Sequence, residues 1–357
     1  MNGSDPAVSP APAGRLICQR IDGIGGRLLT LLWTLRLARK VDAGVLLFWP
    51  KFELFYDHAT GPGELFDLYR LASPPMRDRL QIVDGDCRRF LRFHEVNLEW
   101  RKAHDPSAYV VPSDADPLHE KLPVIVGNWE GPLIAPGETR QEALAEMPSV
   151  FAELPIRRDL LGHIERVEKV HKLYRMVAVH IRRGEIVRNL RQAVAGFRLN
   201  EPDGHDLLDD RIGTFARRCM SLDNFAEAVR GFVEEGRTLV VFSDEPGVHD
   251  ALALALGTPN VIPAASLVTG RFTPMQQAFV EACLMSRCRC IVGARSAYST
   301  LANVIGANSR VLLETHSRTA EDCTNFALES VADELAAHPE RAQVEQRIHE
   351  EIIRLRG

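Results

Sequence analysis

Short apolar runs alternate with longer runs of helical period along most of the chain. In the second half the apolar runs predict five strands, namely Met176–His180, Thr238–Phe242, Val261–Ile262, Cys290–Val292 and Val311–Leu313. Between them, apolar residues three and four positions apart predict helices over Leu222–Glu235, Gly247–Leu256, Pro274–Arg287 and Tyr298–Gly306. Such alternation is typical of parallel sheets with helices on both faces. We therefore predict a five-stranded parallel sheet in this half.

The first half repeats the pattern less regularly. Strands are expected at Leu16–Ile21, Val45–Trp49, Gln81–Val83 and Pro123–Val126, with a helix over Gly26–Val41. Segment 140–173 is helical in pattern and is interrupted by Pro155, so we place the domain junction there. The architecture indicated is α/β, with two Rossmann-like domains facing each other across a cleft.

These patterns divide the chain into four parts. The expected parts are a disordered, Pro/Ala/Ser/Gly-rich leader (1–14), an N-terminal domain (15–155), a C-terminal domain (170–325) and one long C-terminal helix (326–357). A charged stretch with several breakers, Ile186–Met220, interrupts the C-terminal domain, and we expect it to be a mobile lid.

Composition excludes several classes of protein. The 357 residues are 45% hydrophobic and 25% charged, which fits a globular protein and not a disordered, collagenous or membrane-spanning one. A net charge of −5 gives no global basic field for nucleic acid or an anionic membrane. The seven cysteines contain no C-x-x-C pair, and the leader has no apolar run like that of a signal peptide. We therefore expect a cytoplasmic protein with reduced thiols, no zinc site and no transmembrane segment.

A glycine-rich turn joins the first strand to the first helix. Gly25 and Gly26 there would let the backbone and the helix N-terminus approach a phosphate, although a plain tight turn is the alternative. An NAD site fits poorly, because the third glycine of G-x-G-x-x-G is replaced by Leu28 and Asp42 precedes the second strand instead of ending it.

Two further clusters follow strands of the second half. His180-Ile181-Arg182-Arg183-Gly184-Glu185 places two arginines where ligands bind in open α/β sheets, and their forked donors suit a diphosphate. Strand alternation puts Arg182 on the face of His180 and turns Arg183 away, so one arginine is expected to pair with a carboxylate. A solvated basic strand end is the alternative. In Ser243-Asp244-Glu245-Pro246, Asp244 or Ser243 is expected to cap the next helix, with ligand contact as the minority interpretation.

The fourth cluster combines a helix carboxylate with a hydroxyl-rich turn. Ser296, Ala297 and Tyr298 open a helix, so hydroxyl and N–H groups there would point at one anion, and Ser296 would also serve as an N-cap. Glu281 lies among apolar neighbours in mid-helix, which predicts either an internal salt bridge or an acceptor for the N1–H and N2–H donors of guanine.

In this order the four clusters resemble the GDP-fucose-dependent fucosyltransferase superfamily. The likeness is to rhizobial nodulation and core α1,6-fucosyltransferases, with some likeness to bacterial α1,2-fucosyltransferases, and it is good over residues 17–50 and 175–310. It implies a GT-B-like fold and an inverting enzyme that uses a GDP-sugar donor without metal or other cofactor and a glycan or glycoconjugate acceptor.

The resemblance also implies roles for individual residues. Arg182 would hold the diphosphate together with Gly25, Gly26 and Ser296, His180 would lie near the nucleoside, and Glu281 would bind guanine. The wider set of expected nucleotide-sugar contacts adds Arg183, Asp244, Ala297 and Tyr298.

The general base is left open. Glu185 replaces the usual aspartate, and Leu190 stands where the core enzymes have a catalytic glutamate. We take Arg182 and Glu185 as catalytic candidates, with Asp22 and Glu130 as other possible bases. Two alternatives are a nucleotide-sugar-binding protein that has lost catalysis and an NAD-dependent oxidoreductase. The latter would leave the second-half clusters unexplained.

Overall fold

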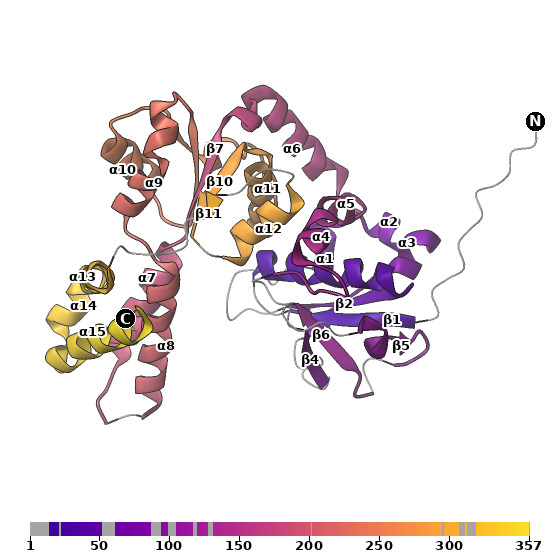
Figure 1. Cartoon of the computed structure of the whole chain (residues 1–357), viewed down its shortest axis with the longest axis horizontal. Coiled ribbons are helices and arrows are strands. Elements are labelled where there is room, and N and C mark those ends of the chain that lie inside the picture. Colours follow the sequence, from indigo (N-terminus) through magenta and orange to yellow (C-terminus); the bar gives the residue numbers. More distant parts are fainter. Residues whose placement is uncertain are drawn as a thin grey trace, which may run out of the picture. The chain divides into compact units, whose positions relative to one another are not determined.

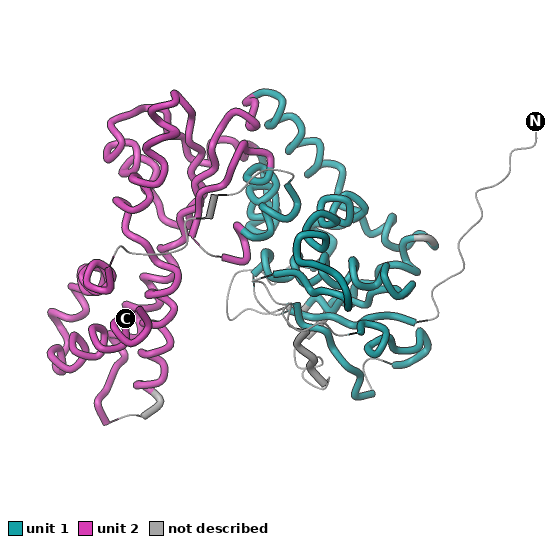
Figure 2. The backbone as a smooth tube through the Cα atoms, in the orientation of Figure 1, with its two compact units in different colours: residues 1–170, 270–286, 300–307 teal, residues 171–269, 287–299, 308–357 magenta. Residues whose placement is uncertain are grey.

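The computed structural model describes residues 14–20, 23–51, 61–86, 94–98, 105–116, 120–127, 131–200, 202–294, 296–306, 311–312 and 319–356. The chain forms two compact units (Figure 2). Unit 1 comprises 1–170, 270–286 and 300–307, and unit 2 comprises 171–269, 287–299 and 308–357. The segments 270–286 and 300–307, which we had placed in the C-terminal domain, are therefore grouped with unit 1.

Unit 1 contains a six-stranded sheet in the order β3-β2-β1-β6-β4, with β5 pairing antiparallel to β1 (Figure 1). The strands are β1 (Gly14–Gln19), β2 (Gly44–Lys51), β3 (Leu80–Asp86), β4 (His94–Leu98), β5 (Val111–Pro112) and β6 (Pro123–Gly127). The strands along the main path pair in parallel. The four predicted strands are confirmed, whereas β4 and β5 were not predicted.

The helices of unit 1 begin with α1 (Ile24–Lys40), which is buried along nearly its whole length. The others are α2 (Leu68–Ala72), α3 (Pro74–Arg79), α4 (Arg140–Ala145), α5 (Met147–Ala152), α6 (Arg158–His171) and α11 (Pro274–Arg287). Leu28 and Trp33 of α1 are fully buried, and Gly127 of β6 is so close to α1 that a Cβ there would lie 2.9 Å from the Cα of Thr30. Apolar packing therefore fixes α1 against the sheet.

Unit 2 contains a parallel five-stranded sheet in the order β11-β10-β7-β8-β9. Its strands are β7 (Val177–Ile181), β8 (Leu239–Ser243), β9 (Val261–Pro263), β10 (Cys290–Gly293) and β11 (Val311–Leu312), accompanied by α9 (Leu222–Glu234) and α10 (Val248–Leu256). Helix α12 (Ala297–Ile305) begins in unit 2, and its residues from 300 on belong to unit 1. The predicted sheet and the α/β class with a parallel sheet in each half are confirmed. From β7 the chain adds β8 and β9 on one side and later places β10 on the other, so the strand order reverses between β7 and β10.

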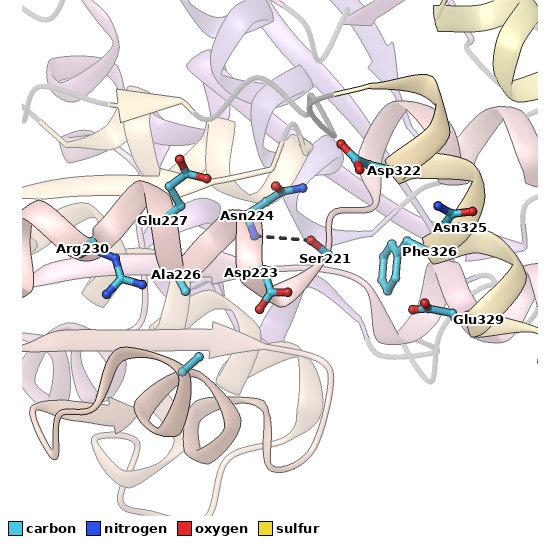
Figure 3. Close-up of a pocket in the computed structure, with 11 residues that line it drawn as sticks. Ser221, Asp223, Asn224, Ala226, Glu227, Arg230, Asp322, Asn325, Phe326 and Glu329 are labelled. Carbon is cyan, nitrogen blue, oxygen red and sulfur yellow. Dashed lines mark hydrogen bonds between the residues drawn. The ribbon is translucent and has the colours of Figure 1, made fainter.

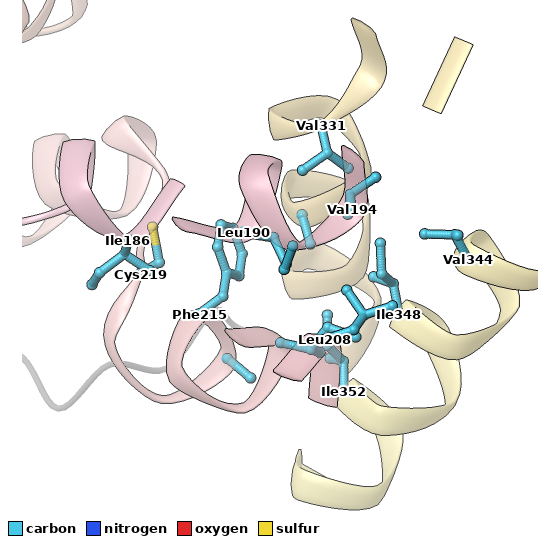
Figure 4. Close-up of a cluster of buried hydrophobic side chains, with 14 of the residues drawn as sticks. Ile186, Leu190, Val194, Leu208, Phe215, Cys219, Val331, Val344, Ile348 and Ile352 are labelled. Carbon is cyan, nitrogen blue, oxygen red and sulfur yellow. The ribbon is translucent and has the colours of Figure 1, made fainter. Parts of the chain in front are cut away.

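Five helices of unit 2 form a separate helical cluster: α7 (Gly184–Gly196), α8 (Pro202–Arg218), α13 (Ala320–Ser330), α14 (Ala332–Ala337) and α15 (Arg341–Arg356). Leu190, Phe215 and Ile348 are fully buried in its apolar core (Figure 4). Arg347 adds a bidentate ion pair to Asp209, with N–O distances of 2.6 and 2.7 Å.

The helical cluster bears on two predictions. Residues 186–220 are almost wholly α7 and α8 instead of a run of breakers, and Ile186, Leu190 and Val194 share the apolar face that α13–α15 cover. The mobility expected of this segment stays a prediction. The single tail helix is wrong, since residues 320–356 form three helices whose apolar faces close on the same core.

Candidate functional site

The predicted residues of unit 2 lie at or just after the carboxyl ends of β7, β8 and β10, and the strand order reverses between β7 and β10. His180 of β7 pairs with Gly293 of β10 on one side and Phe242 of β8 on the other. A Cβ at Gly293 would lie 3.0 Å from the Cβ of His180, so only glycine fits there without displacing the histidine. Crevices at such reversal points are the usual ligand sites of open α/β sheets.

His180 is a buried imidazole with unused hydrogen-bonding capacity. Its side chain is 5% exposed, and its Nδ1 has no hydrogen-bond partner among the described residues. Burial, together with the nearby charge of Arg182, lowers the pKa of His180 to about 3, so the ring is neutral at pH 7. Its centroid lies 5.3 Å from that of Tyr298, which places the histidine beside the start of α12. An unsatisfied buried nitrogen is costly, which favours a ligand or water at this position.

Arg182 lies just beyond β7 and is held by Glu185. Its Nη2 donates to Oε2 of Glu185 at 2.6 Å, and the two side chains are 26% and 22% exposed. Glu185 lies in the first turn of α7, where the helix dipole stabilises a carboxylate. The structure therefore joins the two catalytic candidates as an ion pair, and Glu185 serves as the counter-ion of Arg182.

Arg183 pairs with a carboxylate, as expected of one of the two arginines, and Arg182 does so as well. Its Nε and Nη2 donate to the two carboxylate oxygens of Glu245 at 2.5 and 2.8 Å. The hydrogen bond to Glu245 raises the pKa of Arg183. The guanidinium also lies 5.8 Å from the ring centroid of Phe326 on α13. Arg183 thus links the end of β8 to the helical cluster.

Asp244 caps a helix, but not the one that the sequence indicated. Its Oδ1 accepts from the N–H of Gly184 at 3.2 Å and its Oδ2 from the N–H of Glu185 at 2.8 Å, so it caps α7 from the neighbouring strand end. The N-cap of α10 is Gly247, which has a left-handed backbone (φ 73°). The prediction that Asp244 or Ser243 caps the next helix was wrong, because parallel pairing of β7 and β8 brings Asp244 to the start of α7 first.

Ser296 is the hydroxyl at the start of α12. Its buried Oγ accepts from the N–H of Ser299 at 3.1 Å, which is N-cap geometry. The Oγ of Ser299 donates to the carbonyl of Ala294, 3.1 Å away. Ala297 and Tyr298 form the first residues of α12 and are half-buried. The capping interpretation of Ser296 is therefore observed, and its contact with an anion stays a prediction.

The other expected contacts lie in unit 1. Glu281 is on α11, and its Oε1 accepts from Nε2 of Gln277 at 2.9 Å. No cation pairs with Glu281 in the described part of the chain, so the salt-bridge alternative is not observed there. Burial raises the pKa of Glu281. Gly25 and Gly26 lie in the buried first turn of α1, whose N-cap Gly23 provides no side-chain cap.

The two other possible bases, Asp22 and Glu130, lie outside the described residues. Within the described part, no group of three or more His, Cys, Asp or Glu side chains is arranged to hold a metal ion. No helix described here has both the length and the apolar character that crossing a bilayer requires.

A cavity of about 610 Å³ lies elsewhere in unit 2, between α9 and α13 (Figure 3). Its lining is largely acidic and amide-bearing, with Ser221, Asp223, Asn224, Ala226, Glu227, Arg230, Ala255, Asp322, Asn325, Phe326 and Glu329. None of the predicted site residues is in this set. The candidate site is therefore identified from the strand ends and the residues found there, and not from this cavity. Phe326, which Arg183 approaches, is part of the cavity lining.

Sequence reasoning missed three residues that shape the site. Glu245 stood inside a quoted motif, yet only the fold shows that it binds Arg183. Gly293 ends the strand Cys290–Gly293, and a glycine at a strand end is a signal for close backbone approach. Gly184 also marks a close backbone approach, since a Cβ there would lie 3.1 Å from the carbonyl oxygen of Asp244.

Comparison with known proteins gives similarity among solved structures alone. No protein-family model matches the chain, and no curated protein matches its sequence. POFUT1 in complex with GDP-fucose is 15% identical with a TM-score of 0.43, covering 86% of this chain and 99% of that one. NodZ α-1,6-fucosyltransferase soaked with GDP-fucose is 13% identical with a TM-score of 0.41, covering 82% and 92%. Fucosyltransferase NodZ from Bradyrhizobium is 12% identical with a TM-score of 0.41, covering 85% and 96%. Similarity at this distance assigns no activity to this chain.

Proposed function

We propose that this protein is an inverting, metal-independent glycosyltransferase that transfers fucose from GDP-fucose to a hydroxyl of a glycan or glycoconjugate. One observation carries the proposal. His180 is on β7 at the strand-order reversal of a parallel sheet and Arg182 follows that strand, while Ser296 follows the paired strand β10 and Tyr298 lies beside the histidine. The motifs resemble those of GDP-fucose-dependent enzymes, and the fold brings them to the edge where such sheets bind ligands.

In this proposal each residue of the site has a chemical task. Arg182 binds the diphosphate with its forked donors, and the neutral His180 offers Nδ1 to the nucleoside. Ser296 and the start of α12 contact a phosphate oxygen. Glu281, Gly25 and Gly26 supply the contacts that the resemblance implies, to guanine and to the diphosphate respectively.

The proposed reaction is a single displacement at the anomeric carbon. The acceptor oxygen attacks opposite the leaving group, the bond to the diphosphate breaks, and negative charge develops on GDP in an oxocarbenium-like transition state. Arg182 stabilises that charge, and a lost donor at such a position typically costs about 3 kcal/mol. Glu185 is the candidate to accept the proton of the acceptor hydroxyl, acting from its place beside Arg182.

A second function is favoured by a specific observation. Leu190, at the position of the glutamate in the core enzymes, is fully buried in the core of the helical cluster, and Glu185 is already occupied as a counter-ion. A nucleotide-sugar-binding protein without transferase activity would keep Arg182 and Ser296 and need no base. An NAD-dependent oxidoreductase is disfavoured, since Leu28, in place of the third glycine, is fully buried in the core.

The proposal is tested by ranking nucleotides. GDP, UDP, ADP and NAD are compared by thermal shift with EDTA and with magnesium, and the best ligand at about 100 times its Kd should add about 2.7 kcal/mol of stability. We expect GDP to rank first, unaffected by EDTA, and GDP-fucose to be turned over with a glycan acceptor. GDP binding without turnover would favour the binding-protein alternative. Preference for NAD, or no preference, would contradict both.

A further inference from the structure

The turn after β8 holds the loop after β7 through three contacts within unit 2. Asp244 accepts from the N–H groups of Gly184 and Glu185 at 3.2 and 2.8 Å. Glu245 binds Arg183 through both carboxylate oxygens. At Gly184 the two segments are so close that an added Cβ would lie 3.1 Å from the Asp244 carbonyl oxygen and 3.4 Å from its Cγ. These contacts therefore hold the segments after β7 and β8 together.

Asp244 is also connected to Arg182, because Glu185, one of the two residues it caps, binds Arg182. Glu185 is bound through its backbone N–H by Asp244, and through its carboxylate it binds Nη2 of Arg182 at 2.6 Å. A chain of hydrogen bonds thus runs from Asp244 through the backbone and side chain of Glu185 to the guanidinium of Arg182. Both carboxylate oxygens of Asp244 are occupied by the start of α7, where the helix dipole stabilises the negative charge.

We propose that Asp244 is a positioning residue, which sets the orientation of Arg182 through Glu185 and does not itself contact the nucleotide. The inference rests on the proposed function in taking Arg182 as the residue that grips the diphosphate. It reassigns Asp244, which motif resemblance had placed among the nucleotide contacts. A guanidinium that must match two phosphate oxygens is sensitive to small rotations. Asp244, two hydrogen bonds away through Glu185, should therefore affect affinity.

The first test needs no nucleotide. Asp244→Asn keeps the size of the side chain but turns one acceptor into an NH₂ group that faces a backbone N–H. In the nucleotide-free protein the Nε–Hε NMR signal of Arg182, identified by its loss in Arg182→Lys, should shift in Asp244→Asn and stay unchanged in Glu345→Gln, a distant control on α15. An unchanged Arg182 signal in a folded Asp244→Asn protein would overturn the proposal.

The second test measures binding. In Asp244→Asn we expect GDP to bind about tenfold more weakly by calorimetry, and guanosine, titrated by NMR, to bind within twofold of wild type. In an Arg182→Lys background Asp244→Asn should add little, because the two residues act in one chain. Equal losses for GDP and guanosine, or a full additional loss in the Arg182→Lys background, would contradict a positioning role.

Two glycines of α7 provide a matched pair of variants. Gly184→Ala would push against Asp244 and should weaken GDP binding, whereas Gly196→Ala, where nothing lies within 4 Å, should not. Equal GDP affinity in the two variants would count against the proposal. If wild type fails to bind GDP while Asp244→Asn still displaces Arg182, the proposed function fails and the positioning role stands.

Discussion

Nη2 of Arg182 and Oε2 of Glu185 are 2.6 Å apart, so the arginine expected to bind a diphosphate is already paired with a carboxylate. Glu185→Gln removes a charge that competes with the phosphates, while the amide oxygen can still accept from Nη2 and keep Arg182 oriented. A gain of about 1 kcal/mol would then tighten GDP binding about fivefold. Transfer should instead fall by about 10² or more if Glu185 is the general base.

Calorimetry with GDP and a transfer assay separate these effects in Glu185→Gln, with Glu345→Gln as a control that changes charge on a distant helix. Tighter GDP binding with undiminished transfer would show that Glu185 is only a counter-ion, and the base would have to be sought elsewhere.

Arg182→Lys tests the forked donor. Lysine keeps the charge but loses the planar pair of N–H groups, so we expect transfer to fall by about 10² or more while the melting temperature changes little. Arg230→Lys, at an exposed position on α9, is the matched control. Near wild-type turnover in Arg182→Lys would remove this residue from the diphosphate site.

Glu281→Gln tests guanine recognition. It should weaken GDP much more than UDP, because it replaces a bidentate acceptor by an amide. Burial raises the pKa of Glu281, so protonation as pH falls through that raised pKa should lower wild-type affinity for GDP and leave UDP unaffected. Equal losses for both nucleotides, or an affinity for GDP that is flat with pH, would contradict the assignment.

His180 predicts a dependence of stability on pH. Its folded pKa of about 3 lies below the ordinary 6.5, so the unfolded chain takes up the extra proton between these values. The free energy of unfolding should therefore fall as pH drops from 6.5 toward 3, by up to about 1.4 kcal/mol per pH unit from this group.

Urea unfolding from pH 7 to 4 measures this contribution as a difference between proteins. His180→Gln should flatten the slope, and His349→Gln, at an exposed position on α15, should leave it as in wild type. The same slope in His180→Gln would mean that another group dominates.

Leu190→Glu tests why the glutamate of the core enzymes is absent. Leu190 is fully buried in the helical cluster, so a carboxylate there should destabilise the fold by about 3 kcal/mol or more and restore no catalysis. Leu190→Met should cost less than about 1.5 kcal/mol. A stable Leu190→Glu variant with increased transfer would show that this position faces the site.

Local pattern was enough to predict the second sheet. Val177–Ile181 and Leu239–Ser243 are short apolar runs bounded by turns, and periodicity with turn chemistry identifies such segments because both are properties of neighbouring residues. Strands β4 and β5 were missed, since His94–Leu98 is largely polar and Val111–Pro112 has only two residues. The helical cluster was missed for another reason. Charged residues and a Pro-Asp-Gly sequence interrupt the pattern from which the apolar face of α8 would be recognised.

The sequence by itself determined which residues could do chemistry here: a buried-strand histidine, two adjacent arginines, an acidic turn and a hydroxyl-rich helix start. Only the tertiary structure decided how they are used. Which arginine takes which carboxylate, and which helix Asp244 caps, depends on the parallel pairing of β7 and β8, which joins residues about 60 positions apart. Sequence spacing carries no record of that register, because hydrogen bonds between strands form according to which strands pack side by side.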